Sequence, residues 1–238
     1  MDPSRSSRRT RRRRPERRRR GHPAPPGVTP DGKTASDTNR FDEAAATWDE
    51  DPRRVRLARA VADEIARRID LSPEMDVLDF GCGTGLLTLA LQPLVRSVTG
   101  ADSSAGMLDV LGRKLRERAL ANVETVLLDP KAPLSLDARF HLIVSSMALH
   151  HVADLGPLFR RFHEQLRPGG RVALADLDRE DGSYHEDPRD VFHHGFDRTE
   201  VRSALAAAAF VDLAATTATV TRKDGRDYPV FLITGRRR

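Results

Sequence analysis

Short apolar segments typical of strands alternate with segments of helical periodicity from Phe41 onward. The strand candidates are Asp76–Phe80, Ser97–Ala101, Val123–Leu127, Phe140–Ser145, Arg171–Asp176, Val211–Val220 and Tyr228–Thr234. The helix candidates are Phe41–Trp48, Arg53–Ile69, Leu86–Leu94, Ser104–Leu120, Leu155–Leu166 and Thr199–Ala209. Such alternation builds a parallel sheet with helices on both faces. The sequence therefore predicts a doubly wound α/β domain, whose last two strands pair antiparallel because only a turn joins them.

The basic residues are concentrated at the amino end. The 238 residues carry a net charge of +5, but residues 1–26 hold eleven Arg against Asp2 and Glu16, a charge of +9. The remainder is therefore acidic by four charges. A body of that sign is not typical of a protein that binds polyanions.

Residues 1–40 differ in composition from the rest, since they are rich in Arg, Pro, Gly, Ser and Thr and lack apolar periodicity. We expect a disordered tail over 1–40 and one domain over 41–238. The tail is either a nucleic-acid or nuclear-import patch, a solvated tail, or sequence translated upstream of a start at Val28. With one Cys, no zinc-finger spacing, no secretory signal and no membrane-length apolar run, we expect a cytoplasmic protein.

A glycine-rich turn, Gly81-Cys82-Gly83-Thr84-Gly85, follows the first strand candidate. Ligands of doubly wound sheets lie at the carboxyl ends of the strands, and glycines there let the backbone approach a ligand closely. The spacing departs from the dinucleotide pattern G-x-G-x-x-G, whose last position is Thr88 here. Asp79 would repel a pyrophosphate and suits a ligand with a positive centre. Cys82 is expected to be a small buried residue of the turn rather than a nucleophile.

The second strand candidate is followed directly by Asp102. A carboxylate at that place can accept hydrogen bonds from both hydroxyls of a ribose. Alternatively, Asp102 or Ser103 caps the helix that follows.

Five motifs in order resemble the class I S-adenosylmethionine-dependent methyltransferases, in particular the small-molecule branch of the ubiquinone/menaquinone type. They are Val77–Gly85, Gly100–Leu108, Asp129, Phe140–His151 and Leu166–Arg171, and the resemblance spans residues 41–236. It implies a Rossmann-like, seven-stranded sheet with a C-terminal antiparallel pair, and S-adenosyl-L-methionine as cofactor.

The resemblance also implies a set of cofactor-binding residues. They are Asp79, Gly81, Cys82, Gly83, Gly85, Asp102, Ser103, Met107, Asp129, Ser145 and Trp48. Asp79 would face the amino-acid end of the cofactor and Asp102 the ribose. Met107 would pack on adenine, Asp129 would bind its amino group, and the carbonyl near Ser145 would meet the methionine amino group. Phe41 and Trp48 would close the site, unless Trp48 is a core anchor.

Histidines are the candidates for acceptor chemistry. His150 and His151 follow the fourth strand candidate, and His193 and His194 lie between the fifth strand and the next helix. A neutral imidazole can serve as a general base near pH 7. We therefore take His151, His193 and His194 as catalytic candidates; the alternative is that these side chains only orient loops.

Seven acids lie within residues 176–190. They could form a lid, a cation-binding site or a solvated loop; as a lid they would favour a cationic or neutral acceptor. We expect no metal, since serines follow the fourth strand where catechol-type O-methyltransferases carry metal-binding acids.

The function expected from the sequence is methyl transfer from S-adenosylmethionine to a small molecule by in-line displacement. Its alternatives are an RNA or protein methyltransferase tethered by the Arg-rich tail, a non-catalytic methyltransferase-like binding domain, and an NAD oxidoreductase. We expect no membrane partner, and nucleic acid only through residues 1–26. The acceptor, the methylated atom and the oligomeric state are not determined by the sequence.

Overall fold

The computed structural model describes residues 40–130, 132 and 134–238. The predicted disordered tail therefore lies outside the described residues, except for Arg40. That residue begins the first helix rather than ending the tail.

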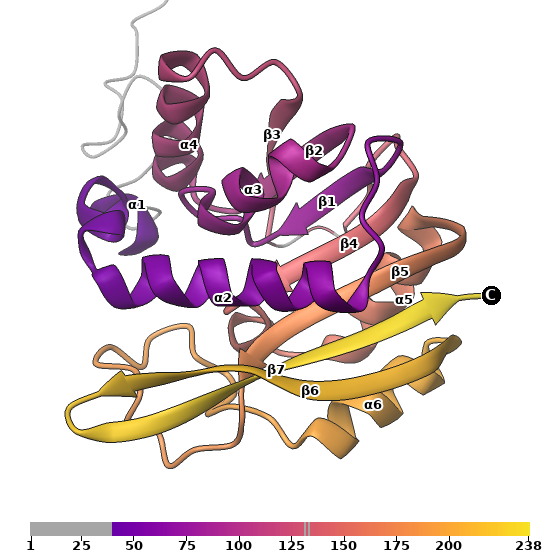
Figure 1. Cartoon of the computed structure of the whole chain (residues 1–238). Helices are drawn as coiled ribbons and strands as arrows, with labels where there is room; N and C mark the ends of the chain where they lie inside the picture. The colour runs from indigo at the N-terminus through magenta and orange to yellow at the C-terminus, as the bar shows by residue number, and fades with distance from the viewer. Residues whose placement is uncertain (1–39, 131, 133) are drawn as a thin grey trace, which may run out of the picture. The chain divides into compact units, whose positions relative to one another are not determined.

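Within the described residues, seven strands form one sheet in the order β3-β2-β1-β4-β5-β7-β6 (Figure 1). The strands are β1 (Asp76–Phe80), β2 (Ser97–Asp102), β3 (Val123–Leu127), β4 (Phe140–Ser146), β5 (Leu166–Leu177), β6 (Phe210–Lys223) and β7 (Arg226–Arg237). Strands β1 to β5 are parallel, whereas β7 pairs antiparallel with both β5 and β6. This confirms the predicted fold class.

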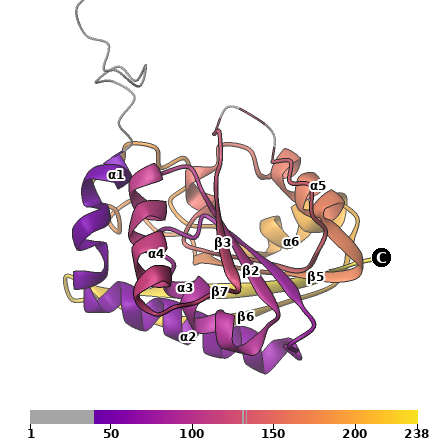
Figure 2. The same ribbon diagram turned by 90° about the horizontal axis from the view of Figure 1, so that it is seen from above.

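The helices cover both faces of the sheet, as Figures 1 and 2 show. They are α1 (Arg40–Ala44), α2 (Pro52–Arg68), α3 (Leu86–Leu91), α4 (Ala105–Glu117), α5 (Leu155–Gln165) and α6 (Arg198–Ala207), with 3-10 helices η1 (Ala45–Glu50), η2 (Gln92–Leu94) and η3 (Leu149–His151). Apolar residues of α2 and α3 pack with Val77, Val98 and Leu142 on one face. On the opposite face, α5 and α6 pack with Leu78 and Ile143.

Local sequence explains where these elements begin. Asp51 accepts a hydrogen bond of 2.8 Å from the amide of Arg53, and Pro52 occupies the first turn of α2, as capped helices require. The predicted helix over Phe41–Trp48 is instead split into α1 and η1. The last two strands are longer than predicted, so their hairpin extends past the point where β5 ends.

Strand order reverses between β1 and β4, which are neighbours although β2 and β3 intervene in sequence. The segments after β1 and β4 therefore leave the sheet side by side. This is the position at which doubly wound sheets bind ligands.

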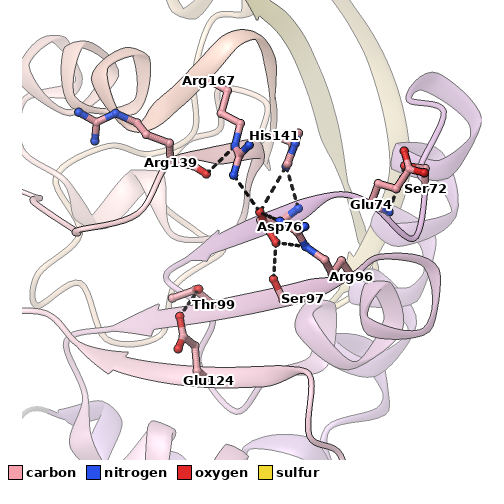
Figure 3. Close-up of polar contacts among 10 residues, drawn as sticks. All are labelled: Ser72, Glu74, Asp76, Arg96, Ser97, Thr99, Glu124, Arg139, His141 and Arg167. Atoms are coloured by element: carbon pink, nitrogen blue, oxygen red, sulfur yellow. Dashed lines mark hydrogen bonds and ion pairs between the residues drawn. The ribbon is translucent and has the colours of Figure 1, made fainter.

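A polar network fastens the opposite, amino-terminal edge of the sheet (Figure 3). Asp76, the first residue of β1, accepts hydrogen bonds from Arg96 Nε at 2.7 Å and from Ser97 Oγ at 2.8 Å. Its own amide donates to His141 Nδ1 at 3.0 Å, and Arg167 Nη2 lies 3.3 Å from its carboxylate. These contacts, Arg96 foremost, hold the pKa of Asp76 below its usual range.

We expect Asp76→Asn to destabilise the fold by about 1 kcal/mol, because it removes charge-assisted hydrogen bonds. Cofactor binding should not weaken, since Asp76 lies at the opposite end of β1 from the glycine turn. A carboxyl group whose pKa is lowered on folding stabilises above its unfolded pKa. That contribution disappears as the pH falls below about 4. Urea unfolding at pH 7 and pH 3 measures it. Equal losses at both pH values would contradict the assignment.

Candidate cofactor and acceptor site

The glycine turn combines left-handed backbone with close packing. Gly81, Gly83 and Gly85 have φ of 71°, 53° and 82°, conformations that favour glycine. A Cβ at Gly81 would clash with Ala148, so this glycine lets the segment after β4 pack on the turn. At Gly83 the nearest atom to such a Cβ is Met107 Sδ, 4.0 Å away. The backbone at Gly83 is thus accessible to a close-fitting ligand.

Asp102 connects the end of β2 to this turn. Its carboxylate accepts hydrogen bonds from the amides of Gly83 at 2.7 Å and Ser104 at 2.9 Å. Burial raises the pKa of Asp102, and the neighbouring Asp42 adds to the rise against these bonds. A carboxylate has about four acceptor sites, so Asp102 retains capacity for ribose hydroxyls. It is the side chain of Ser104, through a bond from the Met107 amide, that caps α4.

Asp79 is a buried acid beside the same turn. It is 1% exposed, and the Thr88 hydroxyl donates to it at 2.6 Å. Burial, with a further contribution from the charge of Asp102, raises the pKa of Asp79 to about 7. A positively charged ligand would favour the ionised form of this carboxyl group.

The segment formed by α1 and η1 is anchored over the turn. Asp42 Oδ1 accepts from Ser104 Oγ at 2.5 Å and from the Gly106 amide at 2.7 Å. Thr84 Oγ1 donates to Asp49 at 2.6 Å. Met107 is buried against Ala45, with Phe41 and Trp48 packed around them, and Arg54 stacks on the Trp48 ring at 3.7 Å. Trp48 thus lies beside Met107, as a closing residue would.

The remaining predicted cofactor residues lie in different environments. Cys82 is buried, as expected, and burial raises its pKa well above the usual value, which argues against a nucleophile. Ser145 is fully buried, and its hydroxyl donates to the carbonyl of Phe80 at 2.9 Å. Ser103 and Asp129 are exposed after β2 and β3. All of these residues follow or end strands on the carboxyl edge.

Three imidazoles from two segments form a cluster near the ends of β4 and β5. The His150 ring lies 4.1 Å from that of His151 and 4.6 Å from that of His185. His150 Nδ1 lies 2.8 Å from Asp176 Oδ1, and both side chains are buried. His151 Nδ1 lies 2.6 Å from the carbonyl of Asp190, so this nitrogen carries the proton. We call His150, His151 and His185 the imidazole cluster.

Burial keeps two members of the imidazole cluster neutral. It lowers the pKa of His151 to about 4 and that of His185 to about 3, and the neighbouring imidazoles add to both effects. The sequence predicts that the fifth strand ends at Asp176 and leaves open whether residues 176–190, which include His185, form a lid, a cation-binding site or a solvated loop. In the structure β5 runs to Leu177, so that Asp176 lies inside the strand, and the His185 ring packs on that of His150. One signal was available in the sequence. The fifth strand candidate ends at Asp176, and the neighbouring fourth candidate ends shortly before His150.

The two other catalytic candidates contact different groups. His193 Nε2 lies 3.0 Å from the carbonyl of Val152, and its ring lies 4.9 Å from that of Phe196. It lines a hollow of about 410 Å³ between α5 and α6. His194 is exposed, with Nδ1 3.7 Å from Glu180.

The acidic segment, residues 178–190, is largely neutralised by basic partners. Its ion pairs are Asp178–Arg198 (2.6 Å), Asp181–Arg226 (2.8 Å), Glu186–Lys223 (3.1 Å) and Asp187–Arg189 (2.6 Å). Lys223 and Arg226 lie at the tip of the β6–β7 hairpin, so the segment is fastened to that hairpin. With its charges paired, it no longer argues for a cationic acceptor. No group of His, Cys, Asp and Glu in the described part of the chain is arranged to hold a metal ion.

Comparison with known proteins identifies the family. Residues 53–215, more than half of the chain, match the family model described as a methyltransferase domain. The chain belongs to this family, which confirms the resemblance noted in the sequence.

Individual relatives agree with this assignment. An uncharacterized methyltransferase of Schizosaccharomyces pombe is 37% identical over 135 residues, covering 51% of this chain and 48% of the relative. A ubiquinone biosynthesis O-methyltransferase of Chelativorans is 30% identical over 135 residues, covering 52% and 51%. The chain thus spans about half the length of these curated relatives.

A solved structure shares the fold. It is a phosphoethanolamine N-methyltransferase of Haemonchus contortus, in complex with phosphomonomethylethanolamine and S-adenosylhomocysteine. It superposes with a TM-score of 0.61 at 15% identity, covering 74% of this chain and 52% of the other. With the family match, this supports S-adenosylmethionine as the cofactor.

Among the described residues, no helix is long and apolar enough to cross a membrane.

We predict that Asp79→Asn stabilises the ligand-free protein relative to wild type at pH 8 but not at pH 4. An acid whose pKa is raised on folding favours the folded state below its unfolded pKa, and this advantage is lost as the pH rises toward 7. The difference should reach about 2–4 kcal/mol. Chemical unfolding of both proteins at the two pH values measures it, with exposed Asp109→Asn as control. A difference independent of pH would contradict the assigned titration.

Proposed function

We propose that this protein transfers the methyl group of S-adenosylmethionine to a small-molecule acceptor. The observation that carries the proposal is the pair of partly or fully buried acids, Asp79 and Asp102, at a glycine turn open to close approach. A ligand with a sulfonium and an ammonium group would offset their charge, whereas a pyrophosphate would add to the repulsion. The family match supports the same choice over an NAD oxidoreductase.

The predicted residues suit the parts of such a cofactor. The amides of the Gly81–Gly85 turn would lie against its methionine part and ribose, with Asp79 at the amino-acid end and Asp102 on the ribose. Met107 would pack on adenine, Asp129 would bind the adenine amino group, and Trp48 with Phe41 would close the site. Ser145, whose side chain is committed to Phe80, would contribute its carbonyl.

The cofactor, when bound, would supply a methyl group on a sulfonium. In an in-line displacement the acceptor atom bonds to this methyl group as the thioether leaves, so no covalent enzyme intermediate is needed. The residues of this chain hold the acceptor in line and keep water away. His151 is the better-placed of the base candidates. Its Nδ1–H is committed to the Asp190 carbonyl, which leaves Nε2 as the proton acceptor. A pKa near 4 makes it a weak base, suited to an acceptor that loses its proton readily.

Two considerations support a small-molecule acceptor. Ser145-Ser146-Met147-Ala148 stands where methyltransferases of DNA bases and protein amides carry Asn/Asp-Pro-Pro-Tyr/Phe. The chain outside residues 1–26 is acidic, which disfavours RNA. The curated relative from Chelativorans is named for ubiquinone biosynthesis, and we extend to this chain only the acceptor's size class. His193 and His194 stay predicted contributors to the acceptor side.

We expect Asp102→Ala to weaken binding of S-adenosylhomocysteine at least tenfold, because two charge-assisted bonds to the ribose are lost. Calorimetry measures the affinity, and NADH should give no heat with either protein. Asp102→Asn separates ribose binding from integrity of the turn, and exposed Asp109→Ala is the matched control. Undiminished affinity in Asp102→Ala would exclude the proposed cofactor site.

We expect isotopic label from S-adenosylmethionine to appear in small molecules when the protein is incubated with a cell extract. Mass spectrometry of fractions separated by size locates the label, with Asp102→Ala as the inactive control. Label found only in RNA or protein would favour the tethered alternative. In that case labelling should fall as the salt concentration rises and should disappear when residues 1–26 are removed.

A further inference from the structure

Two buried side-chain nitrogens, one in the imidazole cluster and one near it, have no hydrogen-bond partner. Over the described residues, four buried side-chain atoms are in this condition: Arg40 Nε, Glu180 Oε1, His185 Nε2 and Arg237 Nε. Unpaired buried polar atoms are uncommon in folded proteins and often mark a place that a ligand or water completes. Arg40 and His185 are of interest because both lie near His151, on the carboxyl edge of the sheet.

A short chain of contacts joins this place to the glycine turn. Met107 Sδ is the nearest atom to a Cβ built on Gly83, and Met107 belongs to the apolar cluster that Phe41 joins. The Phe41 ring lies 5.1 Å from that of His151, and the His151 ring lies 6.1 Å from that of His185. Arg40 stacks on Phe41 at 4.7 Å. Packed side chains thus connect the unpaired atoms to the proposed cofactor site.

Both side chains are held in place by other contacts. Arg40 Nη1 donates to the carbonyl of Asp187 at 2.8 Å, and this leaves its Nε–H uncommitted. The His185 ring packs between His150 and Tyr184, at 4.6 and 5.1 Å between ring centroids. His150 is fixed in turn by Asp176. These atoms are preorganised, so a ligand that bonds to them would not have to order them.

The charges at this place favour an anion with a single charge. Arg40 is a permanent cation, and its charge lowers the pKa of both His151 and His185, which places all three groups within electrostatic reach. The nearby Asp187 carboxylate lies 3.7 Å from Arg40 but is bonded bidentately by Arg189. One guanidinium N–H and one N–H of a neutral imidazole match the two oxygens of a carboxylate. A phosphate dianion would call for more cationic donors.

We propose that Arg40 Nε and His185 Nε2 bind a carboxylate of the acceptor molecule, with the His150–Asp176 pair positioning the imidazole of His185. This inference rests on the proposed function, since the acceptor must lie beside the cofactor. It names the chemical class of the group recognised and leaves open which atom is methylated.

Titration of the full chain with benzoate tests the proposal, with benzamide as the neutral isostere and inorganic phosphate as the dianion. Imidazole C–H resonances in proton NMR report binding, and the His185 signal is the one missing from His185→Gln. We expect benzoate to shift that signal, and benzamide and phosphate to leave it unchanged. Arg40→Met should weaken benzoate at least tenfold, and Arg40→Lys should recover part of the loss. Arg113→Met, which removes an exposed arginine of α4, is the matched control and should bind normally.

Each titration is run with and without S-adenosylhomocysteine, whose own binding is measured separately. Binding of S-adenosylhomocysteine without any response to benzoate would overturn the carboxylate site and leave the proposed function standing. Equal benzoate affinity in Arg40→Met, Arg113→Met and wild type would overturn it as well. If wild type does not bind S-adenosylhomocysteine, the proposed function fails, and the benzoate titration alone then decides whether Arg40 and His185 form an anion site. A melting temperature close to wild type establishes that each variant is folded.

Discussion

The hydrogen bond from the Gly83 amide to Asp102 is the contact on which the site depends. It joins the turn after β1 to the end of β2, and the same carboxylate also accepts from the Ser104 amide at the start of α4. Asp42 then caps α4 from the amino-terminal helix and raises the pKa of Asp102 further. Three acids are thus gathered around one turn, if buried Asp79 is included. Burial foremost, and then the charges of neighbouring acids, raise the pKa values of Asp79 and Asp102, so that a positively charged ligand would favour their ionised forms.

Most of the fold could be predicted from sequence because periodicity reports which face of each element is buried. Strands β1 and β3 match the predicted bounds, and the glycine turn with Asp79 and Asp102 follows from the rule that parallel strands end at one edge. The hairpin strands β6 and β7 extend past their predicted bounds at both ends: at the tip, Lys223 and Arg226 pair with the acidic segment, and at the other end β7 continues beside β5. Local pattern contains no information about such partners.

The acceptor side illustrates the same limit. Asp176 sits in a run of acids, and a run of acids normally faces water. Only the tertiary structure reveals that its carboxylate bonds His150, 26 residues earlier, while Arg40 bonds Asp187, 147 residues away. The order of the strands in the sheet determines which residues meet across loops. The spacing of residues along the chain does not reveal that order.

The family model matches residues 53–215, and this range contains only part of the proposed site. The glycine turn, Asp79 and Asp102 lie inside it, as does the imidazole cluster. Arg40 and Phe41 precede it, and Lys223, Arg226 and Tyr228, which fasten the acidic segment through Glu186, Asp181 and Ser183, follow it. The glycine turn and the acids Asp79 and Asp102 thus come from the matched part of the chain, whereas Asp42 and Trp48 precede it. The groups that fix the segment carrying His185 come from the two ends, and the amino end also contacts the glycine turn through the bond from Thr84 to Asp49. The amino-terminal segment therefore contacts both regions, the glycine turn through Asp49 and the acidic segment through the bond from Arg40 to the Asp187 carbonyl.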